Sequence, residues 1–244
     1  MKGRMLEKVL VLVCVCVFAG RALAAIGTVS VDCGSGYSNP DYAAAPIGDL
    51  QDLYVGSAVA PDEGDVWNRT LMHYDPAWSV IFSGTYDAVA SDGTPTGIDI
   101  ECGFTGAFQY AGAHDMMKDY YYAHGGATVD IIITDLNALS NYDLYLYSNG
   151  DMGQGSIFVF DGTTLGTTGD GGPFGGTFVE GQNYVKYSLT SDIDGTISGV
   201  YTTNGASDYG ILNGMQIVGD MPVPEPATMS LLGFGALALI RRKR

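Results

Sequence analysis

The stretch Ala127–Thr134 (ATVDIIIT) indicates the fold class, because its apolar side chains recur at every second position. In an extended strand, Val129, Ile131 and Ile133 share one face and the residues between them share the other. Tyr142–Tyr147 (YDLYLY) repeats this alternation. Such a pattern is typical of an antiparallel strand with one buried face.

Other stretches extend the same pattern along the chain. Ser156–Phe160 (SIFVF) is apolar on both faces, as expected of a central strand. Further predicted strands are Thr28–Cys33, Trp78–Ser83, Gly97–Phe104, Tyr184–Leu189, Thr196–Tyr201 and Gly210–Val218. Glycine-rich turns separate them. Only Asp115–Ala123 (DMMKDYYYA) is predicted to be helical, with Asp115 as its N-cap.

Many short strands without crossover helices predict an all-β fold, an antiparallel β-sandwich of the jelly-roll type. Residues 25–220 are long enough for one such domain, and no linker interrupts them. Within the body, three basic residues face 25 acidic ones. So acidic a surface repels phosphate backbones, which excludes nucleic acid as a partner.

Residues 1–24 are typical of a secretory signal peptide. A basic start precedes the apolar run Val9–Ala19, which is too short to span a bilayer. Ala22 and Ala24 form the small-x-small pattern that signal peptidase cleaves, which predicts Ala25 as the first mature residue. Cysteines within the apolar run would be removed with it.

The chain ends with a proline-rich stretch, an apolar stretch and a basic cluster, spanning residues 221–244. The proline-rich stretch comprises Val223, Pro224, Glu225, Pro226, Ala227 and Thr228. The apolar stretch is Met229–Ile240. The basic cluster comprises Arg241, Arg242, Lys243 and Arg244. This order predicts an extended stop, a short transmembrane helix and cations that stay in the cytoplasm.

This tail resembles the PEP-CTERM (VPEP) sorting signal of Gram-negative and related bacteria. The resemblance implies sorting by exosortase, a membrane peptidase that cuts near the motif, and delivery to the cell surface or to exopolysaccharide. The body resembles, more loosely, the β-sandwich bodies of PEP-CTERM proteins. Gly64–Asn68, Leu139–Tyr147 and Gly210–Ile217 carry that likeness. It implies a jelly-roll or galactose-binding-like shape and no established activity.

Cys33 and Cys102 are the two cysteines of the mature body. In an oxidising compartment they form either one disulfide or two buried thiols, and the sequence leaves both open. Asp192 and Asp194, followed by a turn glycine, are candidate ligands for a structural Ca²⁺, although a complete EF-hand loop is missing. No other cofactor is expected.

Three functions fit these patterns. The first is a non-enzymatic structural or adhesive protein, processed by signal peptidase and exosortase and transiently anchored in the inner membrane. The second is a carbohydrate-binding module with surface aromatics, for which the candidates are Trp67, Trp78, Tyr120–Tyr122, Tyr145 and Tyr147. The third is a glycoside hydrolase or lyase with paired carboxylates, for which Asp99 and Glu101 share one strand face.

Overall fold

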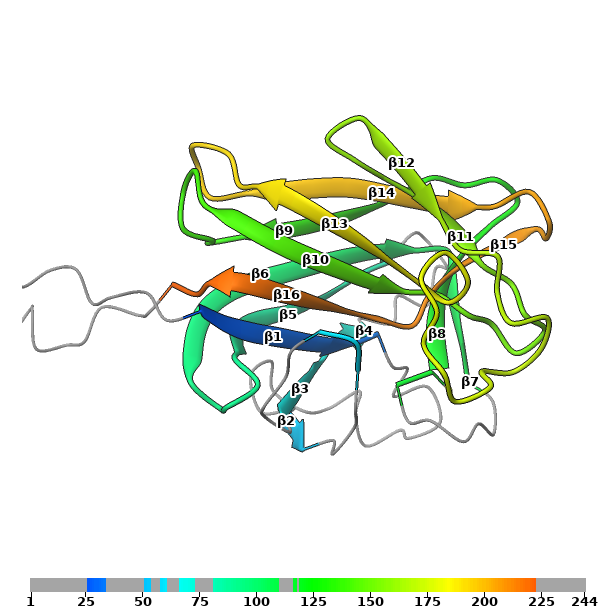
Figure 1. The fold of residues 1–244 in the computed structure, drawn as a ribbon, viewed down its shortest axis with the longest axis horizontal. Coiled ribbons are helices and arrows are strands. Elements are labelled where there is room, and N and C mark those ends of the chain that lie inside the picture. Colours follow the sequence, from blue (N-terminus) through cyan, green and yellow to red (C-terminus); the bar gives the residue numbers. More distant parts are fainter. Residues whose placement is uncertain are drawn as a thin grey trace, which may run out of the picture.

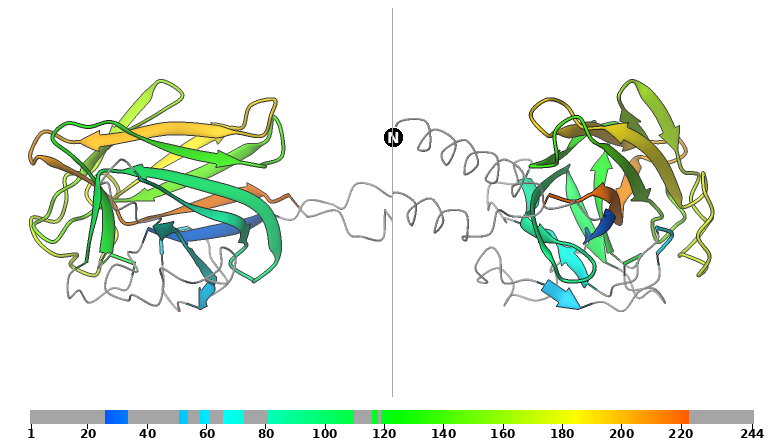
Figure 2. Two further views of the ribbon diagram at one scale, coloured as in Figure 1. Left: turned by 180° about the vertical axis from the view of Figure 1, so that it is seen from behind. Right: turned by 60° about the vertical axis from the view of Figure 1, so that its left-hand side comes forward.

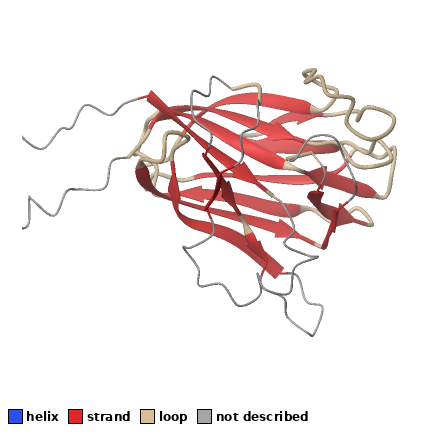
Figure 3. Cartoon of the chain, turned by 90° about the horizontal axis from the view of Figure 1, so that it is seen from below, coloured by secondary structure: helices blue, strands red, loops and turns tan. Residues whose placement is uncertain are grey.

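The computed structural model describes residues 26–33, 51–53, 58–60, 66–72, 81–109, 116–117 and 119–222. These residues form strands in three sheets and contain no helix, which confirms the all-β prediction (Figure 3). Two large sheets stack face to face, as Figure 2 shows, and the third lies across one end of the stack.

The six-stranded sheet has the order β13-β10-β16-β1-β3-β2. Its strands are β1 (Ile26–Asp32), β2 (Gln51–Leu53), β3 (Val66–Arg69), β10 (Asn141–Tyr147), β13 (Tyr184–Thr190) and β16 (Gly214–Asp220). All pairs are antiparallel except β1 and β3, which run parallel with Ser30 opposite Trp67. Apart from this pair, the six-stranded sheet is antiparallel, as the sequence predicted. Parallel pairing is possible because a long connection, rather than a hairpin, joins β1 to β3.

The seven-stranded sheet has the order β12-β11-β14-β9-β6-β5-β4. Its strands are β4 (Leu71–Met72), β5 (Ile81–Val89), β6 (Pro95–Phe104), β9 (Val129–Thr134), β11 (Ser156–Phe160), β12 (Thr163–Gly166) and β14 (Ile197–Thr203). The predicted strand at Ser156–Phe160 is confirmed at both ends, while β12 was not predicted because its residues are mostly polar or glycine.

The three-stranded sheet has the order β15-β8-β7 and lies at the right of Figure 1. It contains β7 (Gly106–Gln109), β8 (Asp119–His124) and β15 (Tyr209–Leu212). The helix predicted at Asp115–Ala123 is therefore wrong over its described part. Residues 116–117 form a turn, and β8 is hydrogen-bonded on both sides. Pairing with two neighbours overrode the local helical pattern.

The predicted strand Gly210–Val218 is two strands, β15 and β16, separated by Asn213. The buried Asn213 side chain donates to the carbonyl oxygens of Met117 and Asp119, and its Oδ1 accepts from the Asn149 backbone N–H. These bonds hold the chain where it passes from the three-stranded to the six-stranded sheet.

The main core lies between the two large sheets. Fully buried side chains from both meet there, among them Val31, Ile100, Ile131, Leu144 and Phe158. Alternate residues of each strand point inward, which explains the period of two in the sequence.

A second, smaller core covers the outer face of the six-stranded sheet. Trp67, Tyr145 and Tyr147 are buried there against residues from other segments, including Met117 and Phe174. Tyr147 donates to Gln216 Oε1 at 2.5 Å, and burial raises the pKa of its phenol well above the usual range. The prediction that Tyr145 and Tyr147 form an exposed face is therefore wrong, because segments distant in sequence cover that face.

Candidate functional site

Both ends of the body lie at one end of the sandwich. Ile26, the first residue of β1, is opposite Asp220, the last residue of β16 (Figure 1). The Asp220 carbonyl oxygen accepts hydrogen bonds from Tyr142 Oη and Asn137 Nδ2, each at 2.8 Å. Met221 is buried in the main core. The folded body therefore extends through Met221, two residues before Val223, where the proline-rich stretch begins.

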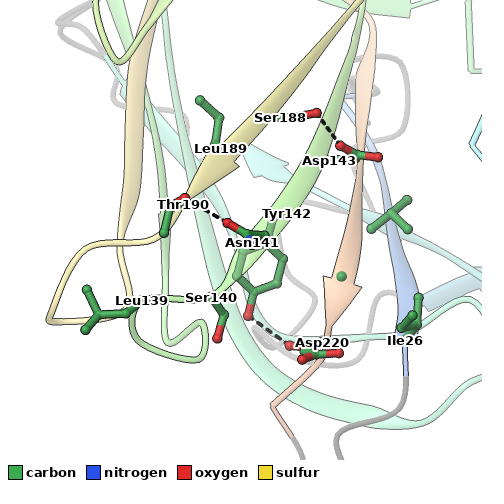
Figure 4. A pocket seen from close by; sticks show the side chains of 12 residues that line it. Ile26, Leu139, Ser140, Asn141, Tyr142, Asp143, Ser188, Leu189, Thr190 and Asp220 are labelled. Atoms are coloured by element: carbon green, nitrogen blue, oxygen red, sulfur yellow. Dashed lines mark hydrogen bonds between the residues drawn. The ribbon is translucent and has the colours of Figure 1, made fainter.

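An open groove of about 620 Å³ lies beside this end (Figure 4). Residues from β1, β10, β13 and β16 line it. Ile26 and Leu139 flank it with side chains that are 80% and 65% exposed. Its polar groups bond mainly to one another, since Ser188 Oγ donates to Asp143 Oδ1 and Thr190 Oγ1 donates to Asn141 Oδ1.

Asp143 and Asp220 are the two carboxylates that line this groove. Lys186 Nζ lies 2.7 Å from Asp143 Oδ2, and hydrogen bonds from Lys186 and Ser188 lower the Asp143 pKa. A glycosidase needs one carboxyl with a raised pKa to act as the general acid. Asp143 is shifted in the opposite direction, so it is unsuited to that role.

Among the residues that the structure describes, the carboxyl whose pKa is raised lies elsewhere. Burial raises the pKa of Asp99, whose Oδ1 accepts from the Asp87 backbone N–H at 2.8 Å. Asp99 and Glu101 alternate with core residues of β6 and so lie on the outer face of the seven-stranded sheet. The sheet stack separates Asp99 from the groove.

The candidate calcium ligands lie in the turn after β13. Asp192 Oδ1 accepts from the backbone N–H groups of Asp194 and Thr196, so this carboxylate already stabilises its own turn. Over the described ranges, no group of three or more His, Cys, Asp or Glu side chains is arranged to hold a metal ion. Calcium binding stays a prediction.

Cys33 and Cys102 come from opposite sheets and meet in the main core. Both are free thiols in this structure, and their side chains adjoin each other. Burial raises the pKa of the Cys33 thiol well above its usual value.

Most of the aromatic candidates from the sequence are buried. Trp67, Tyr120 and Tyr121 are enclosed in addition to Tyr145 and Tyr147, and Tyr122 is half-buried. Trp78 lies outside the described residues. Sequence reasoning overlooked Phe108 and Tyr209, which lie on the strands beside β8. Each is a single aromatic in a short strand, so no local pattern distinguishes it.

The predicted signal peptide (residues 1–24 with Ala22, Ala24 and Ala25) and the tail from Val223 to Arg244 lie outside the described residues. In the part of the chain that is described, no helix is long and apolar enough to cross a membrane.

Residues 222–244 match the family model of the PEP-CTERM protein-sorting motif. The tail is thus a PEP-CTERM tail, as its proline-rich, apolar and basic segments predicted. The motif implies export and membrane-associated sorting by exosortase. A comparison with curated protein sequences found no match.

Several solved structures show a weak likeness to this chain. CBM35 from Cellvibrio japonicus Abf62 is 15% identical with a TM-score of 0.29, over 48% of this chain and 86% of that one. An exo-beta-1,3-galactanase from Phanerochaete chrysosporium is 17% identical with a TM-score of 0.30, over 46% and 26%. The plant receptor-like kinase ANX2 is 14% identical with a TM-score of 0.39, over 83% and 57%. Likeness at this level assigns no activity.

Proposed function

We propose that this chain is an exported, non-enzymatic envelope protein that exosortase processes, with a structural or adhesive role in or on extracellular polysaccharide. One observation carries the proposal: the sorting motif begins at residue 222, directly after the last core residue, Met221. We assign its two stacked sheets to the jelly-roll or galactose-binding-like class.

The position of this boundary makes the tail separable from the body. β16 lies between β10 and β1, so its hydrogen bonds are complete within the six-stranded sheet. A cut after residue 222 leaves every strand and every described core residue in place. A cut before Met221 would remove a buried side chain, which costs stability.

The tail then acts in three steps. Pro224, Glu225 and Pro226 hold an extended segment for recognition, because proline fixes the backbone and cannot continue a helix. The apolar Met229–Ile240 inserts into the inner membrane, and the terminal cations keep the end of the chain in the cytoplasm. Exosortase cleavage near the motif releases the body.

The carboxylates support a role without catalysis. The groove beside the termini contains Asp143, which Lys186 keeps ionised, whereas the Asp99 pKa is raised on the other sheet. Because a hydrolase needs both kinds of carboxyl within one groove, this separation favours a structural or adhesive role over the hydrolase or lyase alternative.

The test is mass spectrometry of the protein recovered from the envelope and medium of its native host. We expect an N-terminus near Ala25 and a C-terminus between residue 222 and the apolar stretch. Deleting residues 223–244 should change the fraction in which the body is found. Recovery of the intact basic terminus from the cytosol would refute the proposal.

A further inference from the structure

The three-stranded sheet has one face on the main core and one face turned away from it. Tyr121, Ala123 and Leu212 are fully buried on the core face. Alternation along the strands puts Tyr120, Tyr122 and His124 of β8 on the opposite face. The pairing of Phe108 with Tyr120 and of Tyr209 with His124 adds two more rings to it.

These five residues (Phe108, Tyr120, Tyr122, His124 and Tyr209) form what we call the aromatic face. Phe108 and Tyr120 have ring centroids 5.7 Å apart. Tyr209 contacts Tyr122 edge-on at 5.3 Å and His124 at 4.7 Å. The rings thus extend across all three strands, and each touches at least one other.

Two local features fix the positions of these rings. Gly106 lies opposite Tyr122, and a Cβ at Gly106 would overlap the Tyr122 ring, so the glycine makes room for it. Tyr120 Oη donates to Asp151 Oδ1 at 2.9 Å. Rings held in this way lose little conformational entropy when a ligand binds.

Four of the five residues of the aromatic face remain accessible to solvent, while Tyr120 is buried. Phe108 is 44% exposed, His124 is exposed, and Tyr122 and Tyr209 are half-buried. The exposed imidazole of His124 adds a polar group beside the Tyr209 ring. Aromatic surface combined with a few polar groups is typical of small-molecule and cofactor sites.

We propose that the aromatic face binds an uncharged polysaccharide chain. The C–H faces of sugar rings carry partial positive charge and pack on the negative π faces of Phe108, Tyr122 and Tyr209. The imidazole of His124 hydrogen-bonds to sugar hydroxyls. This inference rests on the proposed function, which brings the body into contact with extracellular polysaccharide.

The charge of the body selects the class of polysaccharide. Three basic residues against 25 acidic ones repel uronate-rich chains, as they repel other polyanions. A neutral polymer carries no charge to be repelled.

The position of the aromatic face also fits this role. β7, β8 and β15 lie at the end of the sandwich opposite the first residue of β1 and the last residue of β16 (Figure 1). The aromatic face therefore lies at the end of the body away from the point where the tail begins.

Affinity electrophoresis of the full-length chain, purified in mild detergent, tests the proposal with three polymers in the gel. They are a neutral β-glucan, a neutral galactan and alginate, a polyuronate. We expect retardation by at least one neutral polymer and none by alginate. The double variant Phe108→Ala/Tyr209→Ala should bind about tenfold more weakly or not at all, because two stacking surfaces are lost.

Two variants serve as controls. Tyr209→Phe keeps the ring and should keep the affinity, while Leu139→Ala removes an exposed apolar side chain at the other end and should change nothing. If the double variant does not fold, Phe108→Ser alone replaces an exposed side chain and should still weaken binding.

Three results would overturn the proposal. The first is that neither neutral polymer retards the protein, and the second is that the double variant is still retarded. The third is self-association that the double variant abolishes, which would show that a second copy covers the aromatic face. Tail processing is measured separately by mass, so each of these failures leaves the sorting proposal standing.

Discussion

The thiols of Cys33 and Cys102 adjoin each other inside the main core, although one follows β1 and the other belongs to β6 on the opposite sheet. The two residues are far apart in sequence, and only the stacking of the sheets brings them together. A bond between them would link the two layers of the sandwich directly.

We predict that this pair is oxidised to a disulfide after export. The two thiols lose two electrons and two protons to the disulfide of an envelope thiol–disulfide oxidoreductase, which becomes a dithiol. Because burial raises the pKa of Cys33, the folded thiol is a poor nucleophile, so the bond should form before folding is complete. Closing so long a loop stabilises the fold by ~4 kcal/mol in the chain-entropy model.

Mass spectrometry after alkylation under denaturing conditions checks this prediction. Exported protein should resist alkylation at both positions until it is reduced, and Cys33→Ser should leave Cys102 reactive. Protein from the host envelope with both cysteines alkylated before reduction would contradict it.

The stability of the fold should be especially sensitive to substitution of the polar residue Asn68. Its buried side chain donates to the carbonyl oxygens of Ser30 and Val89 and accepts from the Val89 backbone N–H, joining β1 and β3 to β5. Asn68→Ala leaves these buried groups unpaired and should lower the free energy of unfolding by ~2–4 kcal/mol. Chemical denaturation measures this, with the exposed Asn141→Ala as a control expected to change stability by less than about 0.5 kcal/mol.

Asp99→Asn should stabilise the protein at pH 7. Burial raises the folded-state pKa of Asp99, so its ionised form opposes folding at any pH above the unfolded-state pKa of about 3.9. The amide oxygen of Asn can still accept from the Asp87 N–H. The stability gain should disappear when unfolding is measured near pH 3, where the carboxyl is protonated in both states.

The variant Asp143→Asn serves as a control for Asp99→Asn, because the pKa of Asp143 is shifted in the opposite direction. The hydrogen bond with Lys186 lowers the folded-state pKa of Asp143, so the ionised carboxylate stabilises the fold. This stabilisation is present above the unfolded-state pKa and is lost as the pH falls through the folded-state pKa. This variant should be slightly less stable at pH 7 and unchanged at low pH. If both substitutions changed the free energy of unfolding at pH 7 in the same direction and by the same amount, the two pKa shifts would be misassigned.

The last core residue sets where the tail can be removed. A chain that stops after Pro222 should unfold at the same temperature as the full-length protein. A chain that stops after Gly219 loses Met221 from the core and the Asp220 carbonyl that accepts from Tyr142 and Asn137. It should be less stable by at least ~2 kcal/mol. Thermal unfolding compares the two, and equal stability would place the end of the body before β16 ends.

Local pattern was sufficient for much of the fold. Ser156–Phe160 was predicted at both ends, and Val129–Thr134 and Tyr184–Thr190 to within two residues, because alternating apolar side chains reflect the two faces of a strand. The sorting tail was likewise recognisable, since its three segments act through their order along the chain.

It was harder to predict which faces of the sheets are exposed to solvent. Tyr145 and Tyr147 alternate with core residues and so are expected in solvent, yet segments from elsewhere in the chain bury them. Tyr120–Tyr122 was predicted to be helical, and its strand depends on the hydrogen bonds of β7 and β15. Neither effect leaves a signal in the surrounding residues.

The sequence by itself determined the all-β class and the sorting tail, because both depend on residues that are neighbours along the chain. Only the tertiary structure decided that Cys33 meets Cys102 and that Phe108, Tyr122 and Tyr209 share one surface. These residues are distant in sequence, and the pairing of strands and stacking of sheets that unite them minimise exposed apolar area over the whole molecule.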